Sequence, residues 1–207
     1  MADDIQNLDS SPILRIPVNY QGDISGEMQY FRDVLQFMGT TQKLIYYSDS
    51  KYPRSYQIEF LFEKQEKYEF LEFWNNLKGE FSKFWYISEE RSFELVSNIE
   101  SSDTSFLAKS NNFEEVFKGN ERVCFRFRNG DLLTRKIESI TCDKINDECL
   151  LETGVSFDRN INLEDIFGIF YILPVRFEEE VCKIVNESKE VSTLQMRIKE
   201  LLGEYPS

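Results

Sequence analysis

The sequence contains no histidine among its 207 residues. Histidine is the commonest general base at neutral pH and the commonest metal ligand in proteins, so both roles fall to other residue types here. Ser-His-Asp and Cys-His catalysis cannot occur within this chain. Phosphate-binding loops, nucleophile-elbow motifs and zinc-protease motifs are missing as well. The sequence therefore predicts that the protein is not an enzyme, with no catalytic residues, no metal ligands and no cofactor.

The chain also lacks the features that mark export or membrane insertion. Its apolar runs are well below the roughly 20 residues that span a bilayer, which predicts no membrane anchor. The opening residues, MADDIQNLDSS, are acidic and polar, unlike a signal peptide. The four cysteines, Cys124, Cys142, Cys149 and Cys182, contain no CxxC pair, and we expect reduced, partly buried thiols. These features favour a soluble protein that is made in a cytoplasm.

Basic residues are scarce relative to acidic ones. The 24 Lys and Arg stand against 37 Asp and Glu, which gives a formal net charge of −13. Affinity for nucleic acid comes mainly from clustered Lys and Arg, so we expect no specific binding of nucleic acid. Aromatic residues, by contrast, reach 14%, with 18 Phe and 10 Tyr. This amount of ring surface is typical of a packed core or an interface.

The hydrophobic pattern divides the chain into three parts and predicts a β-rich α+β fold. Residues 1–12 are polar and acidic, and they are predicted to form a disordered N-terminal arm. Residues 13–105 and 174–207 are predicted to form a core domain of strands that carries a packed helix. Residues 106–173 contain four or five short strand patterns, which favours an inserted small β-barrel.

Helical spacing of apolar residues occurs in three segments. Residues 64–78 give the clearest helix, and Gly79 stands where a C-terminal cap belongs. Residues 27–38 also favour a helix, although their aromatic and β-branched residues leave a strand open. Ser188 can cap a final helix over residues 189–202, for which a strand again stays an alternative.

A hairpin with a basic first strand is predicted within the inserted part. Asn129-Gly130 is the strongest turn signal in the chain, because both positions of such a turn need positive φ. Arg122, Arg126 and Arg128 precede the turn on one face of the strand. Guanidinium groups in a row can hold an acidic surface through bidentate pairs. We therefore interpret these arginines as a candidate inter-subunit interface, with a solvated strand face as the alternative.

Two acidic segments resemble ion-binding sites, but structural roles explain both. Residues 178–180 are EEE, and successive residues on a strand point to opposite faces, so they cannot converge on one ion. The segment DKINDE at 143–148 lacks the glycine and the terminal glutamate spacing of a calcium loop. Turn formation accounts for its Asp and Asn residues.

The stretch Tyr52–Ile87 resembles tail-tip proteins of long-tailed bacteriophages and gene transfer agents, of the distal tail protein or tail-hub type. The resemblance rests on Pro53-Arg54 at the start of a strand, the aromatic helix at 64–78, Gly79, and the aromatic strand FSKFWYI. A basic strand and a Pro-Val-Arg-Phe return at 174–177 follow in the same order. The similarity covers roughly residues 40–180.

This resemblance implies a β-sandwich core that carries a helix, with an inserted small barrel. It also implies a structural component of a phage-like tail tip, a ring or adaptor that joins the tail tube to the tip or receptor-binding apparatus. Its implied partners are further copies of itself in a cyclic homo-oligomer and tail proteins such as the tube and hub, with DNA passing nearby at most and not bound specifically. Its implied location is the virion tail, after synthesis in the host bacterial cytoplasm. Two alternatives stay open: a cytosolic β-barrel binding module for a small ligand or protein partner, and a hydrolase that uses only carboxylates.

Overall fold

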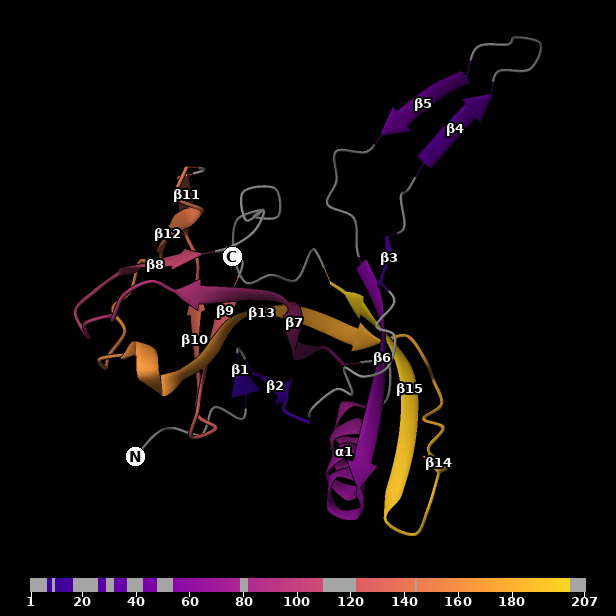
Figure 1. Cartoon of the computed structure of the whole chain (residues 1–207). Coiled ribbons are helices and arrows are strands. Elements are labelled where there is room, and N and C mark those ends of the chain that lie inside the picture. The colour runs from indigo at the N-terminus through magenta and orange to yellow at the C-terminus, as the bar shows by residue number, and fades with distance from the viewer. Residues whose placement is uncertain are drawn as a thin grey trace. The chain divides into compact units, whose positions relative to one another are not determined.

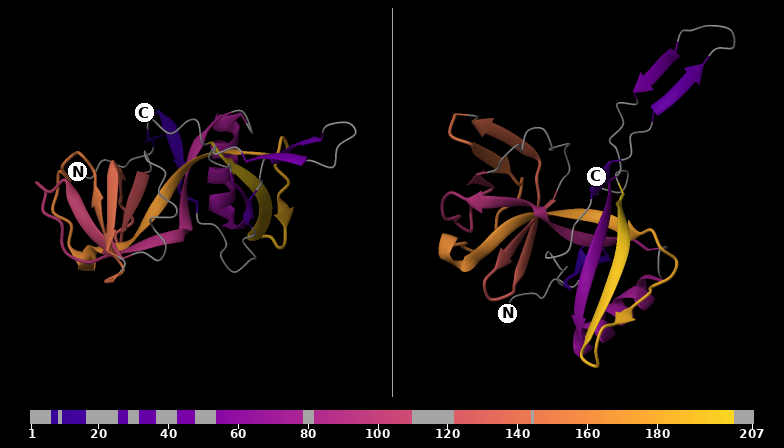
Figure 2. Two further views of the ribbon diagram at one scale, coloured as in Figure 1. Left: turned by 90° about the horizontal axis from the view of Figure 1, so that it is seen from above. Right: turned by 45° about the vertical axis from the view of Figure 1, so that its right-hand side comes forward.

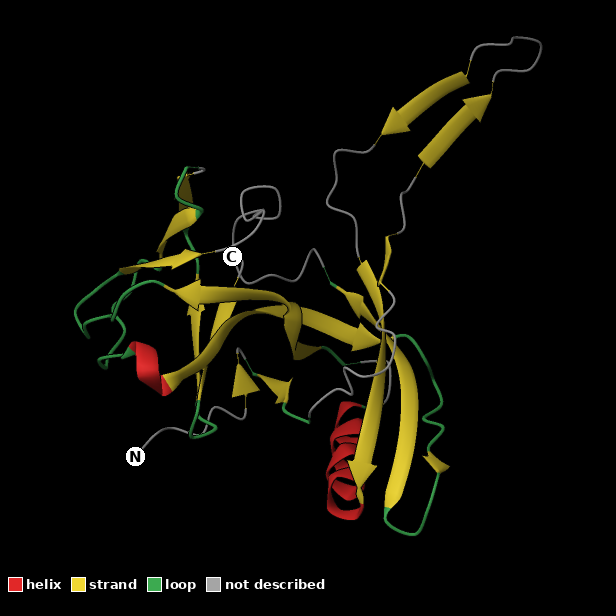
Figure 3. Ribbon diagram, in the orientation of Figure 1, coloured by secondary structure: helices red, strands yellow, loops and turns green. Residues whose placement is uncertain are grey.

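A computed structural model describes residues 7–8, 10–16, 26–28, 32–36, 43–47, 54–78, 82–109, 122–143 and 145–201. Strands predominate among these residues, and most belong to one large mixed sheet beside a single α-helix (Figures 1 and 3). The predicted β-rich α+β class is therefore confirmed. Within the described residues, no helix is long and apolar enough to cross a membrane.

The chain divides into two compact units. The first contains Met1–Arg15, Phe84–Pro174 and Tyr205–Ser207, and the second contains Ile16–Lys83 and Val175–Glu204. The first boundary therefore follows Lys83, whereas the sequence placed it after residue 105. The reason is that the aromatic strand continues as β7 (Phe84–Leu95) and pairs with β8 (Ser105–Lys109), which draws residues 84–105 into the inserted unit.

The second unit is centred on two long antiparallel strands, β6 (Arg54–Glu63) and β15 (Val191–Glu200). They pair continuously from Glu63↔Val191 to Ser55↔Lys199. Shorter strands are β3 (Gly26–Met28), which pairs with β6, and β14 (Val185–Asn186), which pairs with β15. β4 (Arg32–Gln36) and β5 (Lys43–Tyr47) form a separate two-stranded sheet. Strands therefore replace the helix predicted over residues 27–38.

The final helix predicted over residues 189–202 is also wrong, because these residues form β15. Leu194, Met196 and Ile198 are buried and alternate with polar residues, which is the two-residue period of a strand. Ser188 does cap backbone N–H groups, but in a turn: its Oγ accepts hydrogen bonds from the N–H groups of Glu190 and Val191 at 3.2 and 3.1 Å.

The predicted helix at 64–78 is confirmed as α1 (Lys64–Leu77), which lies along one face of β6 and β15 (Figure 2). At its N-terminus the Glu66 carboxylate accepts a hydrogen bond from the Glu63 backbone N–H at 2.9 Å, as in a capping box. Its C-terminus ends at Lys78, whose φ of 55° supplies the left-handed cap that the sequence assigned to Gly79. Gly79 itself lies outside the described residues.

Aromatic rings join α1 to the sheet of the second unit. The Phe70 ring lies 5.0 Å from that of Phe60 and 5.1 Å from that of Phe62. The Trp74 ring lies 4.8 Å from that of Phe177 at the end of β13 (Ile166–Phe177). All five side chains are buried, so the aromatic clusters of the sequence serve mainly as core.

The first unit contains the remaining strands. They are β1 (Asn7–Leu8), β2 (Ser11–Leu14), β7, β8, β9 (Arg122–Phe127), β10 (Leu132–Lys136), β11 (Ser139–Asp143), β12 (Glu148–Glu152) and most of β13, with a short 3₁₀ helix η2 (Leu163–Asp165). Neighbouring strands follow the order β11-β12-β8-β7-β13, and β9 pairs with both β13 and β10. The core includes three mutually contacting rings, those of Phe106, Phe125 and Phe157.

Part of the predicted disordered arm is ordered. Asn7–Leu8 pairs with Ser11–Pro12 in an antiparallel ladder, and β2 then runs parallel to β7 through Ile13↔Trp85. The Trp85 Nε1–H donates to the Leu8 carbonyl oxygen at 2.8 Å. The hydrogen-bond acceptor of the buried indole therefore lies in the N-terminal segment, whose polar sequence predicted disorder.

The hairpin at Asn129-Gly130 is confirmed, but its turn has three residues instead of two. The Gly130 N–H donates to the Phe127 carbonyl at 3.0 Å, and the Phe127 N–H donates to the Asp131 carbonyl at 2.9 Å. Within this turn only Gly130 has positive φ, at 90°, which matches a type I turn followed by a bulge. Turns of this type need one left-handed residue, and the glycine supplies it.

The expectation of four reduced thiols is wrong for two cysteines. Cys142 and Cys149 are joined by a disulfide across the β11–β12 hairpin, where they face each other in register. Cys124 is a free, buried thiol and Cys182 a free, half-buried one. Burial raises the pKa of Cys124 to about 12, so this thiol stays protonated at neutral pH.

Candidate functional site

Strand β9 carries two of the three arginines that the sequence identified as a candidate interface. Arg122 and Arg126 share a strand face with Cys124, which is fully buried, so this face is not a solvated one. The Arg122 guanidinium lies 5.8 Å from the centre of the Trp85 ring, and that of Arg126 lies 5.2 Å from the centre of the Phe167 ring. Both side chains are half-buried and stack on rings of their own chain.

Arg128 lies beyond the end of β9, in the turn, and is exposed. Its N–H donates to the Asp165 carbonyl at 2.9 Å and its Nε–H to the Glu164 carbonyl at 3.0 Å. These bonds tie the turn to η2. The three arginines therefore do not form one row, and their role at an interface stays a prediction.

The described residues of the first unit form a groove of about 870 Å³. It is lined by residues of β7, β8, the β11–β12 turn, η2 and the start of β13, with Arg128 on its wall. Two of its apolar residues are unusually accessible: Phe167 is 59% exposed and Leu163 is 44% exposed. Exposed large apolar side chains within a concavity are typical of interaction sites.

A β-bulge explains why Phe167 faces outward. Ile166 pairs with Phe127 and Gly168 pairs with Arg126, so Phe167 is an extra residue opposite no partner. Bulges of this kind re-aim a side chain and interrupt the ladder. At Gly168 a Cβ would come within 2.7 Å of the Phe170 ring, so a larger residue would displace that ring.

Charged residues of both signs flank the apolar part of the groove. Lys109 lies between Glu94 and Glu148 in the β7–β8–β12 register. Lys109, Glu94, Arg128 and Asp147 all line the groove. Because cations and anions border exposed apolar side chains, this site suits a protein segment better than a small hydrocarbon or a polyanion.

A second hollow of about 400 Å³ shares Arg128 with the groove. Its wall includes Arg159, whose guanidinium lies 4.2 Å from the centre of the Phe127 ring and 3.7 Å from Asp131 Oδ2. Asp165 Oδ2 accepts a hydrogen bond from the Asn162 side chain at 2.8 Å. The polar groups of this hollow therefore contact mainly one another.

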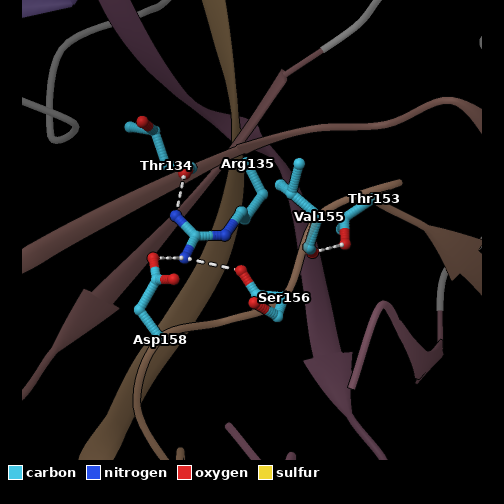
Figure 4. Close-up of polar contacts among 6 residues, drawn as sticks. All are labelled: Thr134, Arg135, Thr153, Val155, Ser156 and Asp158. Carbon is cyan, nitrogen blue, oxygen red and sulfur yellow. Dashed lines mark hydrogen bonds and ion pairs between the residues drawn. The ribbon is translucent and has the colours of Figure 1, made fainter. Parts of the chain in front are cut away.

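Polar contacts hold the loop at 153–159, which reaches the second hollow through Arg159 (Figure 4). Arg135 donates to the Thr134 carbonyl at 2.9 Å, to the Ser156 carbonyl at 3.2 Å and to Asp158 Oδ2 at 2.7 Å. Thr153 Oγ contacts the Val155 carbonyl at 2.7 Å. The guanidinium also lies 5.4 Å from the centre of the buried Phe157 ring, so the loop closes over the core.

The acidic segments behave as structural elements. Asp143 accepts hydrogen bonds from the Ile145 N–H at 2.9 Å and the Asn146 side chain at 2.8 Å, and these bonds lower its pKa. This confirms the turn interpretation of DKINDE. Glu179 accepts from the Arg197 N–H at 2.9 and 2.8 Å, yet burial dominates and raises its pKa. Nowhere in the described ranges do three His, Cys, Asp or Glu residues gather as a metal site would need.

No protein-family model and no curated protein matches this chain. The interpretation of the groove therefore rests on its own residues. Sequence reasoning missed Phe167, Leu163 and Lys109. A signal for the first was present, because a glycine inside the apolar run IFGIFYIL indicates a bulge.

Proposed function

We propose that this protein is a structural component of a phage-like tail tip, a ring or adaptor that joins the tail tube to the tip or receptor-binding apparatus, and that it is not an enzyme. The observation that carries the proposal is the order of its parts. The β6–α1 segment and β15 form one unit, and Phe84–Pro174 is inserted between them. The tail-tip resemblance of residues 40–180 implies the same order.

The finer architecture is part of this proposal. The inserted unit is proposed to be a small barrel, and the strand pairings support it. Pairs β10–β9, β9–β13, β13–β7, β7–β8, β8–β12 and β12–β11 form a path that begins at β10 and ends at β11. Only Ile137 and Glu138 separate these two strands in sequence, so the proposed barrel would close where β10 passes into β11. The second unit is proposed to be a β-sandwich core whose helix is α1.

The proposed assembly is a cyclic homo-oligomer that contacts tube and hub proteins in the virion tail after synthesis in the host bacterial cytoplasm. Closed rings need only one pair of complementary surfaces on each copy. The net charge of −13 suits a channel through which DNA passes without binding.

The test is to purify intact particles from the producing culture and to identify their proteins by mass spectrometry. We expect the chain in the tail fraction, in a constant ratio to the tube protein across the density gradient. An abundant cytosolic protein of the host serves as the control for contamination. The proposal fails if the chain follows that control instead of the particles.

The alternative is a cytosolic β-barrel binding module for a small ligand or a protein partner. The groove of about 870 Å³ with its exposed Phe167 favours it, because a binding module needs such a concavity. Recovery of the chain only in the soluble fraction, bound to one partner, would support this alternative.

A further inference from the structure

The groove of the first unit has the properties of one half of a protein–protein contact. Phe167 is turned outward by the bulge and Leu163 lies nearby on η2, so both present apolar surface to solvent. Lys109 and Arg128 line the same groove, as do Glu94 and Asp147. Among the described residues, no hydrogen bond or ion pair engages the Nη atoms of Arg128 or the ammonium of Lys109. The groove therefore has exposed apolar side chains bordered by two cations and two carboxylates.

The second unit presents a surface of complementary character, the segment at 180–187. Val181 is 61% exposed and Val185 is 56% exposed, and both lie on a short stretch of chain. Glu180 and Glu187 flank them and are exposed, with Lys183 between them. Both surfaces thus have exposed apolar side chains and charges of both signs, so Glu180 can pair with an arginine of the groove and Lys183 with one of its carboxylates.

The C-terminal part of the segment, residues 185–187, is held in place before any contact forms. β14 pairs with β15 through Val185↔Thr193, and the Asn186 side chain accepts from Lys67 Nζ at 2.7 Å and from Ser192 Oγ at 2.9 Å. The Thr193 Oγ donates to Glu187 Oε1 at 3.0 Å. A fixed backbone loses little conformational entropy on association, which favours binding by this segment.

We propose that the segment at 180–187 of one copy binds the groove of a second copy, with Val181 and Val185 against Phe167 and Leu163. The carboxylate of Glu180 then lies near Arg128. The two surfaces are different and belong to different units, so the contact is head-to-tail and leaves one free surface of each kind on a pair. Repetition of such a contact builds a ring when the rotation closes. The inference rests on the proposed function, because it names the contact by which the ring would form.

The experiment uses the full chain and two variants that each lose one surface. The groove variant carries Phe167→Ser and Arg128→Glu, and the segment variant carries Val181→Ser and Val185→Ser. Sedimentation velocity follows self-association of the wild type, and we expect each variant to associate at least about tenfold more weakly. Val155→Ser and Tyr68→Ser, at residues 58% and 63% exposed outside both surfaces, are the matched controls and should associate as the wild type does.

The decisive measurement is a mixture of the two variants. Each variant keeps the surface that the other lost, so the mixture should form a 1:1 complex and nothing larger. Circular dichroism checks that both variants are folded, and Leu163→Ser replaces the groove variant if it is not. A wild type that stays monomeric, variants that associate normally, or a mixture without the 1:1 complex each overturns the inference.

Failure of this inference is distinguishable from failure of the proposed function. If the chain is found in the tail fraction but the mixture of variants forms no 1:1 complex, the tail proposal stands and this contact is rejected. If the 1:1 complex forms but particles contain none of the chain, the contact stands and the tail proposal is rejected.

Discussion

Phe157 provides the sharpest test of how the first unit is stabilised. Its side chain is fully buried although it belongs to a loop, and its ring centre lies 5.5 Å from that of Phe125 and 5.9 Å from that of Phe106. The Arg135 guanidinium covers it from outside at 5.4 Å. If the loop closes the core as this geometry indicates, the Phe157 ring stabilises the first unit as much as a core side chain does.

We expect Phe157→Ala to lower the free energy of unfolding of the first unit by about 3–5 kcal/mol, the usual cost of truncating a buried Phe. The cavity would lie between two rigid rings and a loop that Arg135 fixes, so little collapse is available to reduce this cost. Loss of the cation–π contact adds to it, by about 0.5–2 kcal/mol.

The two tryptophans make the assay specific for each unit. Trp74 lies in α1 of the second unit and Trp85 in β7 of the first. Urea unfolding in a Trp74→Phe background therefore reports on the first unit through the fluorescence of Trp85. Val155→Ala is the matched control on the same loop, because its side chain is 58% exposed and should change stability by about 0.5 kcal/mol at most. Equal effects of Phe157→Ala and the control would refute the idea that this loop seals the core.

Three further predictions concern thiols, pH and the basic strand. Denatured protein without reductant should show two titratable thiols, Cys124 and Cys182, and reduction of the Cys142–Cys149 disulfide should raise the count to four; four before reduction would contradict this disulfide. Because burial raises the pKa of folded Glu179 above the unfolded value, its contribution to stability should be complete below pH 4.5 and be lost as the pH rises through the folded pKa. Glu179→Gln should flatten that part of a stability–pH curve, and an unchanged slope would assign it to another group. Arg122→Glu should lower the free energy of unfolding by about 0.5–2 kcal/mol, because it replaces a cation over the Trp85 ring with an anion; an unchanged urea midpoint would show that the stacking does not stabilise the fold.

Local patterns predicted the elements whose stabilising contacts lie close in sequence. The helix over residues 64–78 has its capping residues and its apolar flank within the segment itself, so the sequence defines it. The hairpin around Gly130 is similar, since its turn and its first pairs are local. Even there the number of turn residues depends on which backbone groups pair, and residue preferences at the turn do not determine it.

The elements that local patterns did not predict depend on distant partners. The segment Val191–Glu200 places apolar residues at both helical and strand spacing, and pairing with β6, more than 120 positions earlier, decides in favour of a strand. The accessibility of Phe167 likewise follows from a register shift against β9. The disulfide depends in the same way on pairing, because Cys142 and Cys149 face each other only in the register that β11 and β12 adopt.

Pro174 lies in β13 between the part that pairs with β9 and the part that pairs with β15. The pairing of β13 with β9 ends at Ile172, and its pairing with β15 begins at Val175. Proline has no N–H to donate, so it is tolerated where one ladder has ended and the next has not begun. The same residue limits the backbone conformations at the boundary between the units, because its φ is fixed. The strand therefore continues through Pro174 while one of its partners changes from β9 to β15.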